Sequence, residues 1–178
     1  AVEAAEKAKE LGISLIITDH HTFRKDGKLP ICDAIVHPAL KGEPTTASAG
    51  VGVAYHVAWA FAAIWSNNSK VNKKLRDVLL DMVSMTAIGT IADMVPLKNG
   101  NRIIARWGLQ MLPTTKNVGL QSIMKEIKTP SHSLAATHVS FGIAPLINAA
   151  GRMAHAAIAL DLLTGLDGKL STAAAAEL

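Results

Sequence analysis

Asp19, His20 and His21 are the residues of this chain best suited to chemistry. They follow an apolar run, residues 13–18, that has the composition of a buried strand. Ligands of open α/β sheets bind just past the carboxyl ends of the strands. A carboxylate beside imidazoles is a suitable ligand set for a divalent metal. The cluster therefore predicts metal-assisted hydrolysis, and the alternative is an ordinary polar loop at the end of a strand.

Asp93 is a second candidate carboxylate. It lies at the end of an apolar helical stretch and shortly before Pro96. The partial negative charge at a helix C-terminus disfavours an anion unless a cation is near. A bound metal would supply that cation, and the alternative is a solvated aspartate that precedes a proline turn.

Asn148 and Arg152 form a third candidate, for phosphate binding. The small residues 149–151 between them allow close backbone approach. A guanidinium group can bind phosphate oxygens in a bidentate manner. The alternative is a helix junction with Arg152 in a surface ion pair. Gly50 and Gly52 could similarly open an anion-binding helix terminus, but tight packing at a helix start is the favoured interpretation.

The other histidines and the tryptophans are interpreted structurally. His56 is expected to be a hydrogen-bonded core residue, and His37, before a proline, to satisfy a turn. The tryptophans fall at predicted core positions of helices: Trp59, Trp65 and Trp107. Base stacking requires exposed aromatic side chains, and few are expected here.

A parallel sheet and its helices must position these groups. Periodicity and punctuation by Gly and Pro predict a helix over 2–11, strands over 13–18 and 34–36, a buried helix over 49–65, one helical region over 73–93, and helices over 102–112, 120–127 and 155–163. This order predicts an α/β domain with a parallel sheet flanked by helices and with a helical second half.

Composition limits the class of protein. The 178 residues are 49% hydrophobic and 18% charged, which is typical of a folded globular chain. The net charge of +4 favours a polyanionic partner, although the basic residues of the chain are scattered and form no long run. The single Cys32 excludes an internal disulfide and fits a reducing cytoplasm. No apolar stretch reaches membrane-spanning length, so no membrane partner is expected. The opening without methionine indicates a piece of a larger protein.

Four sequence blocks resemble the DHH phosphoesterase superfamily and, within it, the RecJ-type exonucleases specific for single strands. In order, these blocks are residues 17–21 with 29–38, residues 49–54, residues 89–97 with 101–102, and residues 144–153. The resemblance extends from about residue 2 to residue 163. It implies a parallel sheet flanked by helices, followed by a linking helix and a second domain, with two Mn²⁺ or Mg²⁺ ions in the catalytic cleft.

The resemblance also implies roles for the candidate residues. His20 and Asp93 would be metal ligands. The catalytic residues would be His21, in contact with the scissile phosphate, and Asp19, either a ligand or a group that orients an imidazole. The implied reaction is hydrolysis of single-stranded DNA from the 5′ end, with two ions stabilising the entering and leaving oxygens.

Asn148 and Arg152 would hold phosphates of the strand near the metals. Leu146 departs from the family, because the exonucleases usually carry a basic residue there. Residues 1–163 are expected to be the C-terminal portion of a DHH domain, and residues 164–178 the start of an interdomain linker.

The family's earlier aspartate motifs would precede this chain and its DHHA1-type domain would follow it. The chain alone is therefore expected to bind metal weakly and to be inactive. Two alternatives remain. One is an oligonucleotide or cyclic-dinucleotide phosphodiesterase of the same superfamily, and the other is a catalytically silent nucleic-acid-binding module.

Overall fold

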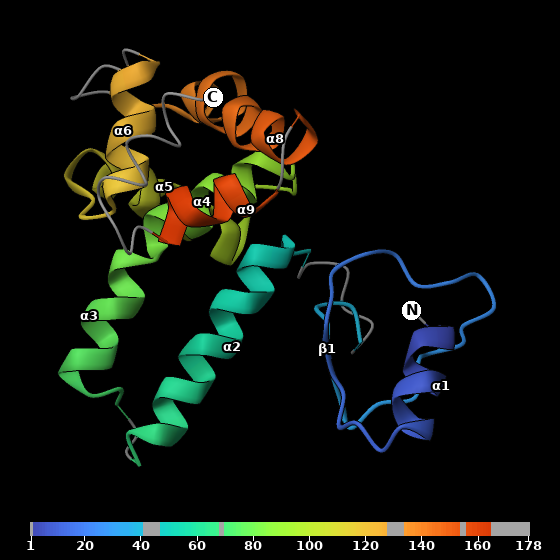
Figure 1. Ribbon diagram of the computed structural model, residues 1–178. Coiled ribbons are helices and arrows are strands. Elements are labelled where there is room, and N and C mark those ends of the chain that lie inside the picture. The colour runs from blue at the N-terminus through green and yellow to red at the C-terminus, as the bar shows by residue number, and fades with distance from the viewer. Residues whose placement is uncertain (1, 41–46, 68–69, 128–133, 154–155, 165–178) are drawn as a thin grey trace.

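The computed structural model of the protein describes residues 2–40, 47–67, 70–127, 134–153 and 156–164 (Figure 1). The predicted linker over 164–178 therefore lies, beyond Thr164, outside the described residues. No helix in the described ranges combines the length and apolar character needed to cross a bilayer.

The first part of the chain forms helix α1 (Val2–Glu10) and two short strands, β1 (Ile16–Thr18) and β2 (Ala34–Val36). The helix ends before Gly12, whose φ of 68° is in the left-handed region that favours glycine. The strands pair in parallel, with Ile17 opposite Ile35, and form a two-stranded sheet within the described residues. The α/β class with a parallel sheet is confirmed.

Strand β1 begins three residues later than predicted, and Asp33 contacts the residue that precedes it. The backbone N–H of Leu15 donates to the Asp33 carboxylate at 2.7 Å, and the Asp33 N–H donates to the Leu15 carbonyl at 2.8 Å. These two bonds hold the residue before β1 beside the residue before β2.

Helices dominate the rest of the described chain, as predicted for the second half, although no helix was predicted over residues 136–153. Their bounds are α2 (Gly50–Trp65), α3 (Lys73–Asp81), α4 (Val83–Ala92), α5 (Asn99–Met111), the 3₁₀ turn η2 (Leu112–Thr114), α6 (Val118–Glu126), α7 (Ala136–His138), the π turn η3 (Val139–Ile143), α8 (Ala144–Met153) and α9 (Ala156–Thr164). Figure 1 shows α4 to α9 gathered at one end of the molecule, with α1 and the strands at the side of α2.

The main apolar core lies among these later helices rather than against the sheet. Its buried members come from α4, α5, η2, α6, η3 and α9: Ile88, Ile91, Ala105, Leu112, Leu120, Ile123, Val139, Ile143 and Leu162. Helices α4 and α5 cross closely at Gly108, where an added Cβ would lie 2.8 Å from the Val83 carbonyl oxygen. The α4–α5 pair thus forms a rigid base for the residues at the ends of these helices.

The helical region predicted over residues 73–93 is confirmed, but it consists of two helices rather than one. A turn at Met82 divides it into α3 and α4. The two parts have different partners, because α3 packs on α2 whereas α4 packs mainly on α5. Apolar spacing alone could not show this division, since both parts are apolar on one face.

The predictions of a buried α2 and of core tryptophans were wrong, and so was that of a core His56, which is hydrogen-bonded but exposed. Phe61, Ile64 and Trp65 are 60%, 80% and 71% exposed, and Trp107 is 56% exposed. Helix α2 contacts α3, α4 and β1, and these elements leave one of its apolar faces open. Composition indicates which side chains prefer burial but not whether another element covers them.

Candidate metal centre

Asp19, His20 and His21 lie at the carboxyl end of the sheet, as the strand pattern predicted. The Asp19 N–H donates to the Val36 carbonyl at 3.1 Å, which extends the ladder of β1 and β2 by one residue. The three side chains therefore leave the sheet at the edge where open α/β sheets bind ligands.

The Asp19 carboxylate organises this loop. Its Oδ1 atom accepts from the backbone N–H groups of His20 at 2.7 Å and His21 at 3.2 Å, and from Nδ1 of the His21 ring at 2.6 Å. The bond from the His21 side chain, with help from the backbone donors, lowers the Asp19 pKa to about 2. The same carboxylate raises the pKa of His21. Because Nδ1 of His21 is occupied, Nε2 is the ring nitrogen left for a ligand.

His20 meets Asp93 from a distant part of the sequence. Nδ1 of His20 lies 3.4 Å from Oδ2 of Asp93, and the side chains are 21% and 40% exposed. Asp93 is the C-cap of α4, where its N–H donates to the Gly89 carbonyl at 3.0 Å. The prediction that Asp93 ends a helix is confirmed, and the His20 imidazole lies beside its carboxylate.

The first residue of α2 makes room for His20. A Cβ added to Gly50 would lie 3.2 Å from Cδ2 of the His20 ring and 3.5 Å from its Nε2 atom. Gly52 is approached in the same way by the Ser48 hydroxyl. The favoured interpretation of these glycines as tight packing at a helix start is therefore consistent with the structure.

His20 and Asp93 fit a divalent cation as part of a ligand set. An octahedral Mg²⁺ ion bound at about 2.1 Å places neighbouring donor atoms about 3.0 Å apart, close to the observed separation of 3.4 Å. Imidazole nitrogen and carboxylate oxygen are both donors that Mn²⁺ accepts. Within the described ranges, however, no group of three or more His, Cys, Asp or Glu side chains could hold a metal. His20 and Asp93 by themselves therefore offer two donors, fewer than a divalent cation requires.

His37 supports the histidine loop from the neighbouring strand. Its Nε2 atom donates to the His21 carbonyl at 2.8 Å, and its Nδ1 atom accepts from the Ala39 N–H at 3.1 Å. The Phe23 ring packs on the His37 ring with centroids 4.3 Å apart. The sequence predicted only the turn function of His37, because its contact with His21 depends on the pairing of β1 with β2.

Among the described side chains, no contact is given between Asn148 and the metal centre. Asn148 is exposed on α8, and no hydrogen bond or ion pair given by the described residues links it to His20 or Asp93. Arg152 belongs to α8, and its side chain lies outside the described part. Leu146, where a basic residue was expected, is partly buried against the core. The phosphate contacts stay a prediction.

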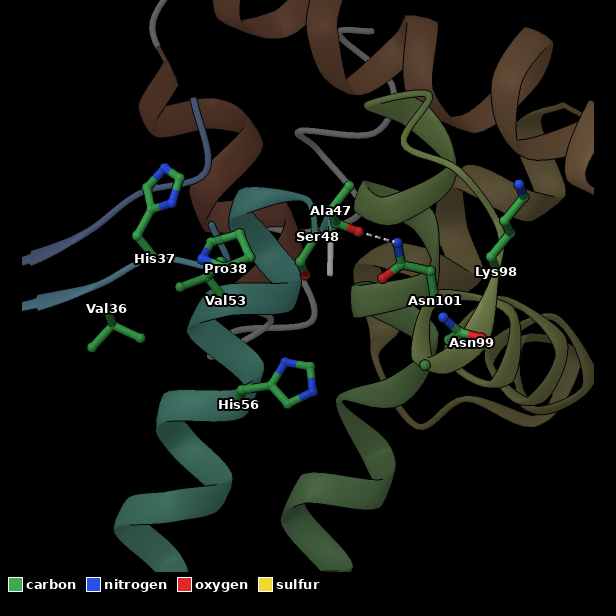
Figure 2. A pocket seen from close by; sticks show the side chains of 11 residues that line it. Val36, His37, Pro38, Ala47, Ser48, Val53, His56, Lys98, Asn99 and Asn101 are labelled. Atoms are coloured by element: carbon green, nitrogen blue, oxygen red, sulfur yellow. Dashed lines mark hydrogen bonds between the residues drawn. The ribbon is translucent and has the colours of Figure 1, made fainter. Parts of the chain in front are cut away.

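Sequence reasoning assigned no role to Asn101, which the structure places beside a cavity. Its Nδ2 atom donates to the carbonyls of Ala47 at 2.6 Å and Pro96 at 3.0 Å. This pair of bonds ties the segment before α2 to the segment after α4. The adjacent cavity measures about 390 Å³ (Figure 2). Asn101 belongs to the third of the sequence blocks that resemble the DHH superfamily, so the sequence did mark this residue as one of interest.

The sheet edge, the histidine loop and the distant aspartate agree with the class of protein that comparison indicates, which is the DHH family. Residues 1–88 match the DHH family, N-terminal domain. The chain is 41% identical over 180 residues to the single-stranded-DNA-specific exonuclease RecJ of Bacillus subtilis (strain 168), in a match that covers 100% of this chain and 21% of that protein. It is 31% identical over 163 residues to RecJ of Escherichia coli (strain K12), covering 89% and 28%.

Solved structures that are similar to this chain are also structures of RecJ. The crystal structure of RecJ in complex with Mn²⁺ from Thermus thermophilus is similar with a TM-score of 0.83 and 32% identity, over 99% of this chain and 26% of that one. A crystal structure of exonuclease RecJ bound to manganese has a TM-score of 0.82, over 99% and 43%. The chain thus spans 21% and 28% of the two curated relatives named.

Proposed function

We propose that the intact protein is a metal-dependent exonuclease that hydrolyses phosphodiester bonds of single-stranded DNA from the 5′ end. The observation that carries the proposal is the approach of His20 Nδ1 to Asp93 Oδ2 at 3.4 Å, from segments far apart in the sequence. The relatives named above are exonucleases specific for single-stranded DNA, and similar structures were determined with Mn²⁺ or Mg²⁺.

In this proposal His20 and Asp93 hold a Mn²⁺ or Mg²⁺ ion. The bound metal would polarise the scissile phosphate and stabilise the charge that develops on its oxygens. Asp19 positions both histidines through its Oδ1 atom. His21, 77% exposed and with Nδ1 held by Asp19, would contact the scissile phosphate through Nε2. A raised pKa favours the protonated form of His21, which suits contact with an anion.

Asn148 and Arg152 are proposed to hold phosphates of the strand further from the metal. Both lie on α8, which packs on α4, the helix that ends at Asp93. We also propose that residues 1–163 are the C-terminal portion of the DHH domain. Because the described residues supply only part of a metal site, this chain by itself is expected to bind metal weakly and to lack activity.

The test is the substitution His20→Ala in the intact protein. We expect loss of Mn²⁺-dependent hydrolysis of a 5′-labelled single strand and weaker Mn²⁺ binding by calorimetry, with cooperative unfolding retained. His138→Ala is the matched control, because His138 lies on α7, where its Nδ1 atom accepts from the Ala135 N–H at 3.0 Å, and no contact with His20 or Asp93 is given among the described residues. Activity retained by His20→Ala would refute the assignment. Absence of any tight Mn²⁺ site in the unmodified protein would favour a catalytically silent module instead.

A further inference from the structure

A cavity beside the metal centre has no role in the proposed chemistry. It measures about 390 Å³ and lies between the end of β2, the first turns of α2 and the start of α5 (Figure 2). This volume is within the range of small-molecule sites. Its walls combine the apolar side chains of Val36, Pro38 and Val53 with the polar groups of His56 and Asn101, with Lys98 and Asn99 near the rim.

Asn101 brings an unpaired acceptor to this cavity. The residue is only 8% exposed. Its amide nitrogen lies against two carbonyl oxygens, those of Ala47 and Pro96. Because carbonyl oxygens only accept, this contact fixes which end of the amide is the nitrogen. The other end, Oδ1, has no hydrogen-bond partner in the described part of the chain. A buried acceptor without a partner costs free energy unless a ligand satisfies it.

His56 supplies a second acceptor from the opposite wall. Its Nδ1 atom lies 2.7 Å from the Gly52 carbonyl oxygen, so Nδ1 must carry the hydrogen. In the neutral imidazole, Nε2 then has a free lone pair. Figure 2 shows His56 on α2 and Asn101 on α5 lining the same cavity from two sides. The cavity therefore offers two acceptors within mostly apolar walls.

A ligand that suits this arrangement is flat, largely apolar and carries N–H donors. A nucleobase has this shape, and its polar edge decides the fit. Adenine, cytosine and guanine carry an exocyclic amino group with two N–H bonds, whereas thymine presents a single ring N–H. A site built to hydrogen-bond an N–H group discriminates strongly against an analogue that lacks it.

We propose that this cavity binds an amino-bearing nucleobase in preference to thymine. The position supports a role near the reacting strand, because His37 lines the cavity and also donates to the His21 carbonyl at 2.8 Å. The base can come from the single strand or from a free nucleotide. For the strand, the inference rests on the function proposed above.

The experiment compares two homopolymers of equal length, oligo-deoxycytidylate and oligo-thymidylate, on the intact protein. Both are pyrimidine strands that differ at the edge the cavity would read. Binding is measured by fluorescence anisotropy with a chelator present, at about pH 8, where an ordinary imidazole is neutral. We expect the cytidylate strand to bind severalfold more tightly.

Variants of His56 test the origin of this preference. His56→Phe keeps an aromatic ring but removes one of the two acceptors, and we expect the preference for the cytidylate strand to fall severalfold. His56→Gln restores a side-chain carbonyl oxygen and should regain part of the preference. The matched control is His138→Phe, which makes the same chemical change on α7 and should behave as the unmodified protein. Thermal unfolding confirms that each variant is folded.

Competition with dCMP and dTMP identifies the source of the base. Stronger displacement by dCMP indicates a free-nucleotide site, whereas preference seen only with strands indicates a site along the DNA. Two results would overturn the inference. One is that the unmodified protein binds the two strands equally and is displaced equally by dCMP and dTMP. The other is a preference that is unchanged in both His56 variants. His20→Ala should lose hydrolysis yet keep the base preference, so failure of this inference and failure of the proposed function are distinguishable.

Discussion

The contact between Gly50 and His20 provides a sharp test of the metal centre. In Gly50→Ala, the new methyl group would lie 3.2 Å from Cδ2 of the His20 ring. Non-bonded carbon atoms prefer separations of about 3.5–4.0 Å. The ring must therefore move by roughly 0.3–0.8 Å, the difference between these values, if the helix start stays in place. That displacement changes the His20 Nδ1 to Asp93 Oδ2 separation of 3.4 Å, on which the shared cation depends.

Stability and function should respond in opposite directions. Gly50 does not have a positive φ, so alanine can adopt its backbone conformation. Replacing glycine at such a position stabilises a protein by about 0.4–1 kcal/mol, because the unfolded chain loses conformational freedom. Disturbing the position of a metal ligand typically reduces metal affinity or activity by about 10–100-fold. We expect an unfolding midpoint that is unchanged or slightly higher. Mn²⁺ affinity and the rate of hydrolysis should both fall by about tenfold.

The assay uses the intact protein, with Mn²⁺ titration by calorimetry, hydrolysis of a 5′-labelled single strand, and thermal unfolding without metal. Gly100→Ala is the control, because nothing lies within 4 Å of a Cβ added there. Metal affinity in this control should equal that of the unmodified protein. If Gly50→Ala binds Mn²⁺ and hydrolyses DNA normally, the His20 ring is not held against α2 in the active protein, and the reasoning from this contact fails.

Two further predictions concern the histidine loop and the helical core. In the metal-free protein, Asp19→Asn should move the His21 pKa back toward 6.5, measured by NMR titration, and an unchanged raised value would contradict the role of Asp19. The Asp19–His21 pair should stabilise the fold fully between pH 3.8 and 6.5, an effect lost as pH falls toward about 2 or rises through the His21 pKa. Gly108→Ala places a methyl group against Ala87 and 2.8 Å from the Val83 oxygen. It should reduce the free energy of unfolding by about 1–3 kcal/mol despite the better helix propensity of alanine, as denaturant unfolding would show.

The histidine loop was the part of the site most open to prediction. Residues 13–18 are mostly apolar and rich in β-branched side chains, and a polar cluster follows at once. The place of Asp19 at a strand end could therefore be predicted from local chemistry. Asp93 was likewise predictable as a helix-end carboxylate, because Pro96 limits the helix. The sequence alone could not bring the two together, since no local pattern records contact between distant segments.

Burial was the least predictable property. Trp65 and Phe61 have the composition of core residues, yet both are mostly exposed on α2. Whether such a side chain is buried depends on the neighbours that pack against its helix, and a sequence pattern describes only the helix itself. The role of Asn101 escaped prediction for the same reason. Its side chain donates to one carbonyl in the segment before α2 and to another in the segment after α4.

The amino-acid sequence by itself determined the order of most elements, the two strand segments that precede α2, and the residue types available for metal chemistry. These properties follow from local side-chain chemistry and the periodicity of the backbone. Only the tertiary structure decided that His20 lies 3.4 Å from Asp93, that Gly50 leaves space for the His20 ring, and that His56 and Asn101 line one cavity. Each of these depends on helix packing, which is set by the whole core rather than by any one segment.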